Sequence, residues 1–222
     1  GDVYKRQAVR RDATLAGSLI NALIAAGQED DFIDPKGALP IISQRTLCIV
    51  VDTYQLGLVE SREILEKCGK VAVIDHHRKG VGFIEKADLV CHEPYASSAS
   101  ELVTEFLQYV GDRDDKPNRI EAEGLLSGIM LDTRDFTLHT GVRTFEAAAA
   151  LRRYGAETEH VRQLFDVSMV EYTTKARLVS EAQMYRGCAI TVSGEVAPEA
   201  RVAIAQAAND LLTIQNVEAS FV

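Results

Sequence analysis

The sequence predicts an α/β fold in which a parallel β-sheet has helices on both faces and is followed by part of a smaller α/β domain. Two apolar runs, residues 46–51 and 71–74, each end at an aspartate and indicate strands. Helical apolar spacing over residues 59–68 lies between them. A strand, a helix and a strand within about 30 residues form a βαβ unit, and unbroken apolar strands are typical of a parallel sheet buried on both faces.

The remaining elements follow from apolar periodicity and from signals at helix ends. The order Ser98, Ala99, Ser100, Glu101 matches a capping box and predicts a helix start. Gly155 predicts the end of a helix. The complete set of further predictions is a strand at 89–91, helices at 14–26, 99–110, 120–131, 143–154 and 169–185, and then a strand at 188–192, a helix at 198–213 and a strand from 217.

These elements suggest two domains. We expect one domain over residues 8–167, a connecting helix over 168–187 and part of a second domain over 188–222. Residues 1–7 fit no periodic pattern and are expected to lie outside the native gene product. Because Val222 lies inside an apolar strand, we expect the second domain to continue in a longer protein.

Composition excludes several classes of protein. The 222 residues carry a formal charge of −9, which argues against a non-specific nucleic-acid coat because such proteins are basic. The sequence lacks an apolar run long enough to span a membrane and lacks a secretory signal pattern. Its four cysteines lack CxxC spacing, which excludes a zinc ribbon or a disulfide scaffold. We expect a reduced, cytoplasmic protein.

The strongest local signal is the order Asp75, His76, His77, Arg78 at the end of a predicted parallel strand. Ligands of open α/β sheets bind beyond the carboxyl ends of the strands, and Asp52 ends the neighbouring strand at the same edge. Carboxylate and imidazole groups together suit manganese, iron or zinc. The alternative is a helix cap at Asp75 with two surface histidines.

Asp132 follows an apolar run in the same way as Asp52 and Asp75. Each of the three can be an ordinary turn or cap residue. Three acidic residues after apolar runs, one beside a histidine pair, favour instead a cleft whose groups bridge two metal ions about 3.5–4 Å apart.

Several residues are candidates for phosphate contacts. Ser97 and Ser98 begin a capped helix, where free amides and the helix dipole favour an anion, although capping alone also explains them. Arg143 begins another helix and can hold a phosphate bidentately or pair with a surface carboxylate, and Arg78 has the same two interpretations. Tyr54 is interpreted as a packing or surface residue, as are His92 and His139.

Taken together, these motifs resemble the DHH phosphoesterase family, and within it the bacterial cyclic-di-AMP phosphodiesterases that carry a DHH domain and an associated C-terminal domain. The resemblance covers residues 21–222. It rests on the segments Val-Val-Asp-Thr (50–53), Val-Ile-Asp-His-His-Arg (73–78), His-Glu-Pro-Tyr-Ala-Ser-Ser-Ala-Ser-Glu (92–101), Leu-Asp-Thr-Arg-Asp-Phe (131–136), Thr-Gly-Val-Arg-Thr-Phe (140–145) and Val-Glu-Ala-Ser-Phe-Val (217–222).

The resemblance implies roles for the candidate residues. Asp52 would bridge two Mn²⁺ ions, and His76 and Asp132 would ligate the same pair. His77 would face the scissile phosphate as the catalytic residue. Ser97, Ser98 and Arg143 would hold the substrate phosphates. The reaction implied is hydrolysis of one phosphodiester bond of cyclic-di-AMP, which gives linear pApA.

Two departures from the family pattern concern activity. Relatives carry an earlier metal motif, a His followed by Asp-x-Asp, and no such motif precedes Asp52 here. Relatives also continue to a Gly-rich substrate loop that contains a His, and the 222 residues end before it. Many relatives have His where Tyr54 stands, a change compatible with metal ligation because Asp52 remains. We therefore expect an internal piece of a longer protein, poorly active by itself.

The resemblance also bears on partners and location. It implies a cyclic-dinucleotide substrate. We expect no stable DNA or RNA binding, and a homodimer is the oligomer considered. The resemblance implies a cytoplasmic domain whose parent protein can be anchored in the cell membrane. Two alternatives remain: a DHH phosphoesterase for short linear oligonucleotides, or a nucleotide-sensing module without turnover.

Overall fold

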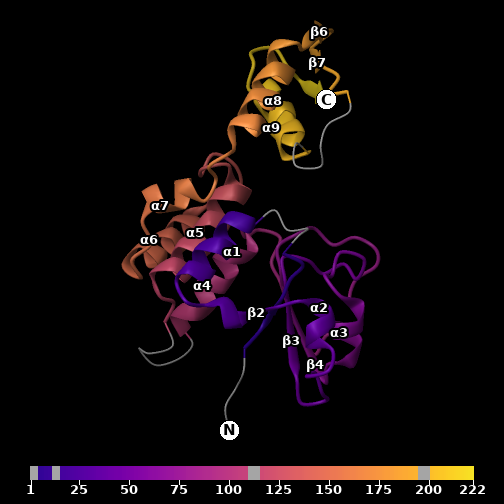
Figure 1. Ribbon diagram of the computed structural model, residues 1–222, viewed down its shortest axis with the longest axis vertical. Coiled ribbons are helices and arrows are strands. Elements are labelled where there is room, and N and C mark those ends of the chain that lie inside the picture. The colour runs from indigo at the N-terminus through magenta and orange to yellow at the C-terminus, as the bar shows by residue number, and fades with distance from the viewer. Residues whose placement is uncertain (1–4, 12–15, 110–115, 195–200) are drawn as a thin grey trace. The chain divides into compact units, whose positions relative to one another are not determined.

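The computed structural model describes residues 5–11, 16–109, 116–194 and 201–222, and its chain forms two compact units, Gly1–Phe165 and Asp166–Val222 (Figure 1). The predicted helix starts at Thr14 and Pro198 lie outside the described residues. Within those residues, no helix combines the length and the apolar character that a membrane crossing requires.

The first unit combines a small sheet with a group of helices. Its strands are β1 (Gln7–Ala8), β2 (Phe32–Ile33), β3 (Leu47–Val51), β4 (Lys70–Asp75) and β5 (Leu89–His92). Its α-helices are α1 (Gly17–Ala25), α2 (Pro35–Ala38), α3 (Arg62–Lys67), α4 (Ala99–Tyr109), α5 (Arg119–Thr133), α6 (Val142–Arg153) and α7 (Thr158–Gln163).

The predicted parallel sheet is confirmed. Its order is β3-β4-β5, both pairs are parallel, and α3 connects β3 to β4 as the βαβ pattern predicts. The register places Val51 opposite Ile74 and Asp75 opposite His92. A separate parallel pair, β1 with β2, was not predicted because each strand has only two residues.

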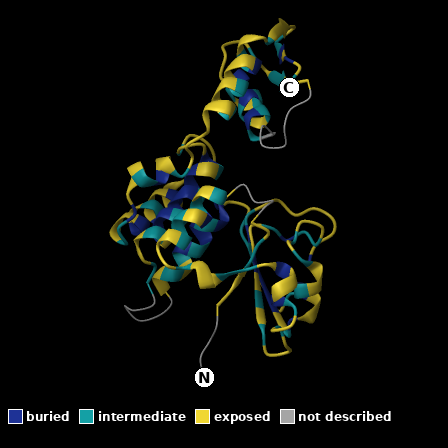
Figure 2. Cartoon of the chain, in the orientation of Figure 1, coloured by how far each residue is buried: buried dark blue, intermediate teal, exposed yellow. Residues whose placement is uncertain are grey.

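The covering of the sheet differs between its central and edge strands (Figure 2). Along the central strand β4, the consecutive residues Val71, Ala72 and Val73 are all buried, as expected for a strand covered on both faces. Along the edge strand β3, Val50 is buried whereas Ile49 and its neighbours on the same face are more than half exposed. Successive side chains point to opposite faces, so the described helices cover only one face of β3.

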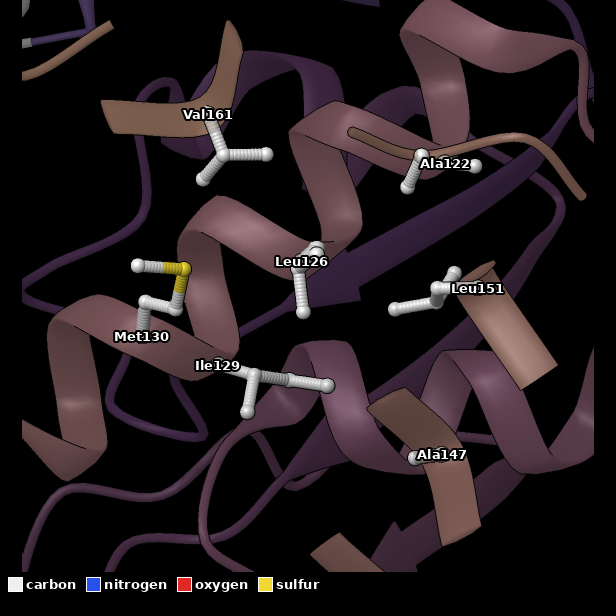
Figure 3. Packing of buried hydrophobic residues seen from close by; sticks show 8 residues of the cluster. Ala122, Leu126, Ile129, Met130, Ala147, Leu151 and Val161 are labelled. Atoms are coloured by element: carbon white, nitrogen blue, oxygen red, sulfur yellow. The ribbon is translucent and has the colours of Figure 1, made fainter. Parts of the chain in front are cut away.

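The largest core cluster lies among the helices and is centred on α5 (Figure 3). Leu126 and Ile129 of α5 pack with Leu151 of α6 and Val161 of α7, and all four are almost inaccessible to solvent. A capping box between Asn118 and Glu121 starts α5. This packing holds the C-terminal end of α5, which carries Asp132, in a defined position.

The second unit contains α8 (Met169–Ser180), β6 (Gln183–Tyr185), β7 (Cys188–Ile190), α9 (Arg201–Leu211) and β8 (Ala219–Phe221). β7 pairs antiparallel with β6 and parallel with β8, and α8 packs against α9. The unit begins at Asp166, so it includes both the predicted connecting helix (168–187) and the predicted second domain (188–222), whose assignment as part of an associated domain stays a prediction.

The predicted helix over residues 169–185 was wrong at its end. The helix stops at Ser180, and the following residues turn back as the hairpin β6–β7. Arg186 and Gly187 both have positive φ, 48° and 79°, which suits the two-residue turn of a hairpin. The polar pattern continued through the hairpin and concealed it.

Gly69 sets the distance between the chain segments that precede β3 and β4. A Cβ atom at Gly69 would lie 1.8 Å from the backbone oxygen of Gln44, a separation that no side chain can occupy. The Gly69 amide donates to the Thr46 carbonyl, so this approach is part of the start of the sheet.

We predict that Gly69→Ala destabilises the protein by about 2 kcal/mol or more, because backbone must move to admit the methyl group. Gly57→Ala is the matched control, since a Cβ there meets no atom within 4 Å, and it should change stability by less than about 0.5 kcal/mol. Urea unfolding of both variants measures the difference. Equal midpoints would contradict the close approach.

Candidate metal centre

Four polar side chains lie close together at the carboxyl edge of the β3–β4 pair. Asp52 directly follows β3, Asp75 is the last residue of β4, and His76 and His77 come next. The Asp52 amide still donates to Ile74 O at 2.9 Å, yet its φ is 62°, in the left-handed region. Aspartate tolerates this conformation better than most residues, and such positions cluster at functional sites.

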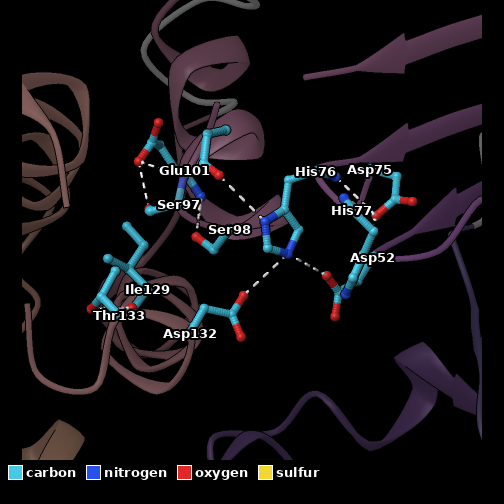
Figure 4. Close-up of polar contacts among 11 residues, drawn as sticks. Asp52, Asp75, His76, His77, Ser97, Ser98, Glu101, Ile129, Asp132 and Thr133 are labelled. Atoms are coloured by element: carbon cyan, nitrogen blue, oxygen red, sulfur yellow. Dashed lines mark hydrogen bonds and ion pairs between the residues drawn. The ribbon is translucent and has the colours of Figure 1, made fainter. Parts of the chain in front are cut away.

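His76 lies between carboxylates that come from both halves of the unit (Figure 4). Its Nε2 is 3.4 Å from Asp52 Oδ1 and 3.5 Å from Asp132 Oδ2. Its Nδ1 is 3.3 Å from the carbonyl oxygen of Ala96. Because a carbonyl only accepts, Nδ1 carries the proton there, and the lone pair of Nε2 in the neutral ring faces two carboxylate oxygens.

The negative charges of the carboxylates around His76 favour the binding of a cation. The hydrogen bond with Asp52 raises the pKa of His76 above its ordinary value, and the charge of Asp132 adds to this effect while burial opposes it. Burial raises the pKa of the Asp132 carboxyl, and the nearby Asp52 charge raises it further, while the histidines lower it. A metal ion placed here would supply the positive charge that otherwise comes from protons.

His77 is oriented by a buried carboxylate. Asp75 is fully buried, and its Oδ1 lies 2.7 Å from His77 Nδ1. The same oxygen accepts the backbone amides of His76 and His77 at 2.8 and 3.2 Å. A carboxylate keeps the proton on Nδ1, so Nε2 of His77 is left as an acceptor or ligand.

This donor set fits a divalent metal ion. Ligand atoms of Asp52, His76 and His77 all lie within 4.8 Å of one another, and Asp132 adds a second carboxylate beside His76. The second oxygen of Asp75, Oδ2, is buried without a hydrogen-bond partner among the described residues, so one acceptor atom behind the site is unpaired. Mixed carboxylate and imidazole ligands suit manganese, iron or zinc.

Asp132 reaches the site from α5, as the helix predicted over residues 120–131 suggests. It lies in the last turn of α5, before Thr133. Three residues with positive φ follow, Arg134, Asp135 and Phe136, at 46°, 54° and 63°. Left-handed backbone costs roughly 1–2 kcal/mol for each such residue, so this segment stores strain beside the site.

A cavity of about 990 Å³ opens at the cluster. His76, His77 and Asp132 line it together with Arg78 and Ser97. Its size is in the range of ligand-binding pockets.

The predicted phosphate turn at Ser97 and Ser98 is buried and already hydrogen-bonded. Ser98 Oγ accepts the Glu101 amide at 3.0 Å, which is the first half of the expected capping box. The Glu101 carboxylate instead accepts the amide and hydroxyl of Ser97, at 3.3 and 2.5 Å. Ser97 lines the cavity, whereas Ser98 is 1% exposed, so their roles toward a substrate stay predictions.

The two candidate arginines have different surroundings. Arg143 binds the Glu105 carboxylate with two hydrogen bonds of 2.8 Å, and its Nε lies 3.9 Å from Glu101. Arg78 lines the cavity and forms no ion pair within the part of the chain that the structure describes. Arg78 is therefore available to bind an anion, whereas Arg143 is already paired with carboxylates.

Tyr54 and His92 anchor the loop that carries His77 and Arg78. The Tyr54 hydroxyl donates to Arg78 O at 2.6 Å and accepts the Gly80 amide. His92 Nε2 contacts the His77 carbonyl, and the Tyr54 and His92 rings meet edge to face at 5.6 Å. Sequence reasoning interpreted both as packing or surface groups, because nothing in a one-dimensional pattern places them under this loop.

Sequence reasoning also missed the supporting roles of Asp75 and Glu101. Asp75 was visible in the motif, but its orientation toward His77 depends on burial. Glu101 was visible as the fourth residue of the capping pattern, but its contact with the Ser97 hydroxyl was not. His139, which was also interpreted as a packing or surface residue, lines the cavity.

We predict that Asp75→Asn weakens divalent-metal binding by about 10- to 100-fold, the usual cost of losing a carboxylate that orients a metal site, because Asp75 accepts the backbone amides of the ligand His76 and of His77. Asp88→Asn is the matched control, because Asp88 also accepts a β4 amide, that of Val71, at 2.8 Å. Isothermal titration with Mn²⁺ compares both with the unchanged protein. Unaltered affinity in Asp75→Asn would show that Asp75 does not position the metal ligands.

Comparison with known proteins places these features in a family. Residues 11–129 match the N-terminal domain of the DHH family. The chain is 47% identical over 191 residues to the cyclic-di-AMP phosphodiesterase GdpP of Geobacillus thermodenitrificans (strain NG80-2). It is 42% identical over 193 residues to the cyclic-di-AMP phosphodiesterase PdeA of Listeria monocytogenes serotype 1/2a (strain 10403S). Each alignment covers 86% of this chain and 29% of the relative.

A solved structure has the same fold. An exopolyphosphatase-related protein from Bacteroides fragilis superimposes with a TM-score of 0.73 at 19% identity, over 88% of this chain and 61% of that one. The chain spans less than a third of the length of the curated relatives named above. The family match covers more than half of the chain and includes Asp52 and the Asp75-His76-His77 motif. The chain therefore belongs to the DHH family, whose members are metal-dependent.

Proposed function

We propose that this chain is part of a manganese-dependent phosphodiesterase that hydrolyses cyclic-di-AMP to linear pApA. The observation that carries the proposal is the convergence of Asp52 Oδ1 and Asp132 Oδ2 on His76 Nε2, at the wall of a cavity of about 990 Å³. Relatives named as cyclic-di-AMP phosphodiesterases align across this whole region at 42% and 47% identity.

The proposed metal ligands are Asp52, His76 and Asp132. The ligand atom of His77 lies within 4.8 Å of the ligand atoms of Asp52 and His76. Divalent metal in such a site lowers the pKa of water and neutralises negative charge on phosphoryl oxygens. Manganese is proposed because carboxylate and neutral imidazole ligands suit it and because the resemblance implies it.

The chain's own residues supply orientation and charge around the substrate phosphate. Asp75 holds the proton on Nδ1 of His77, so its Nε2 can face the phosphate or a metal. The Arg78 guanidinium can bind phosphate oxygens bidentately at the same wall. Glu101 holds the Ser97 hydroxyl, so Ser97 contributes a rigid wall rather than a free amide.

Product analysis tests the proposal. The 222-residue chain and a longer protein that includes it are each incubated with Mn²⁺ and cyclic-di-AMP, cyclic-di-GMP or pApA, and products are separated by liquid chromatography with mass detection. We expect pApA from cyclic-di-AMP with the longer protein. We expect little turnover by the 222 residues, because no His and Asp-x-Asp metal motif precedes Asp52.

The alternatives give different results. Cleavage of pApA without cleavage of cyclic-di-AMP would support an enzyme for short linear oligonucleotides. Binding of cyclic-di-AMP without any product from the longer protein would support a nucleotide-sensing module.

We predict that Arg78→Ala raises the KM for cyclic-di-AMP by about tenfold or more, because a charge-assisted phosphate contact is lost. Arg143→Ala should raise KM less, since Arg143 would have to leave Glu105 to reach a phosphate. It should lower stability by less than about 1 kcal/mol, as expected for a pair whose arginine is 44% exposed.

Steady-state kinetics of the longer protein measure this contrast, and Lys79→Ala is the control for loss of one neighbouring positive charge. A larger KM effect in Arg143→Ala than in Arg78→Ala would assign the phosphate contact to Arg143, as the resemblance implies.

A further inference from the structure

Two aromatic rings form one wall of the cavity that contains the metal cluster. The rings of Phe136 and Phe145 are stacked, with centroids 5.6 Å apart and planes inclined by 15°. Both residues line the same cavity as His76 and Asp132. Nothing in the metal chemistry described above uses either ring.

The two rings differ in how they are supported. Phe136 packs against the buried helical cluster around Leu126 and Ile129, and its amide is held at 3.0 Å by the Thr133 hydroxyl. Phe145 lies in the first turn of α6 and stacks on Phe136, yet 57% of its surface remains exposed. A supported ring with an exposed partner is a platform onto which another flat ring can stack.

We propose that Phe136 and Phe145 form a stacking platform for a nucleobase, with the phosphate of the same ligand at the metal cluster. Inorganic phosphate chains are bound by cations and amide groups, and they have no flat ring that could stack on an aromatic wall. Every nucleobase has a flat π face, and stacking on an aromatic side chain is a common way to bind one without regard to its identity. The platform therefore selects nucleotides over inorganic polyphosphate or pyrophosphate.

The strained backbone next to the platform fixes the position of the Phe136 ring. Phe136 is the last of three residues with left-handed φ, and the strain is tolerated where the Thr133 hydroxyl and carbonyl accept the amides of Phe136, Thr137 and Leu138. Because these hydrogen bonds fix the backbone, the Phe136 ring is ordered before a base binds, and binding costs less conformational entropy.

The inference rests on the proposed function, because it names the class of substrate that the same site takes. Two variants test it: Phe145→Leu removes the aromatic face and keeps an apolar helix-forming residue, and Phe145→Tyr keeps the face. Phe83→Leu is the matched control, because Phe83 is 58% exposed and is not among the described residues that line the cavity.

Calorimetric titration, with and without Mn²⁺, measures the affinity of each variant of the longer protein for pApA and for inorganic tripolyphosphate. We expect Phe145→Leu to bind pApA roughly tenfold or more weakly, with tripolyphosphate binding unchanged. Phe145→Tyr and Phe83→Leu should bind both ligands as the unchanged protein does.

The outcomes separate this inference from the proposed function. If the unchanged protein hydrolyses cyclic-di-AMP and Phe145→Leu still binds pApA normally, the platform is refuted and the function stands. Equal weakening of pApA and tripolyphosphate binding would also refute it, because the effect would then come from the phosphate subsite. If the unchanged protein neither binds nor cleaves any nucleotide, both proposals are wrong.

Discussion

The parallel pairing of β3 with β4 determines where the polar side chains of the site lie. Its register places Val51 opposite Ile74, so the next residue of each segment, Asp52 and Asp75, lies at the same edge of the sheet. A shift of one residue would turn alternate side chains to the other face and separate these groups. The close approach at Gly69, where no Cβ fits beside Gln44, is part of what holds this register at the other end of the strands.

Unbalanced negative charge is the second organising feature, because it explains why the site suits a cation. Asp52 and Asp132 both face His76; the hydrogen bond with Asp52 raises the pKa of His76, and burial raises the pKa of Asp132. Behind them, Asp75 is fully buried and one of its oxygens has no hydrogen-bond partner in the described part of the chain. A buried carboxylate oxygen without a hydrogen-bond partner is costly, and a nearby divalent cation offsets part of that cost.

The site depends equally on the helical half of the unit. Asp132 is positioned by α5, whose Leu126 and Ile129 form the centre of the largest core cluster (Figure 3). The loop before α4 supplies the Ala96 carbonyl that holds His76 and the Ser97 hydroxyl that Glu101 holds. The sheet alone brings Asp52, His76 and His77 together, and Asp132 joins them only because the helices pack against the sheet. The left-handed residues after α5 then turn the chain toward α6 and place two phenylalanine rings against the same cavity.

Local patterns in the sequence were sufficient for the parallel sheet, most helices and the candidate ligands Asp52, His76 and Asp132, because apolar periodicity and strand-end residues are short-range features. They were insufficient for the hairpin at Arg186 and Gly187, since a two-residue turn within a polar stretch leaves little periodic signal. Only the tertiary structure decided that Arg143 is bound to Glu105, that Arg78 faces the cavity, and that Tyr54 supports the loop carrying His77. Each of these contacts joins residues at least 24 positions apart or depends on a cavity formed by several elements, so its partner is chosen by packing and not by spacing along the chain.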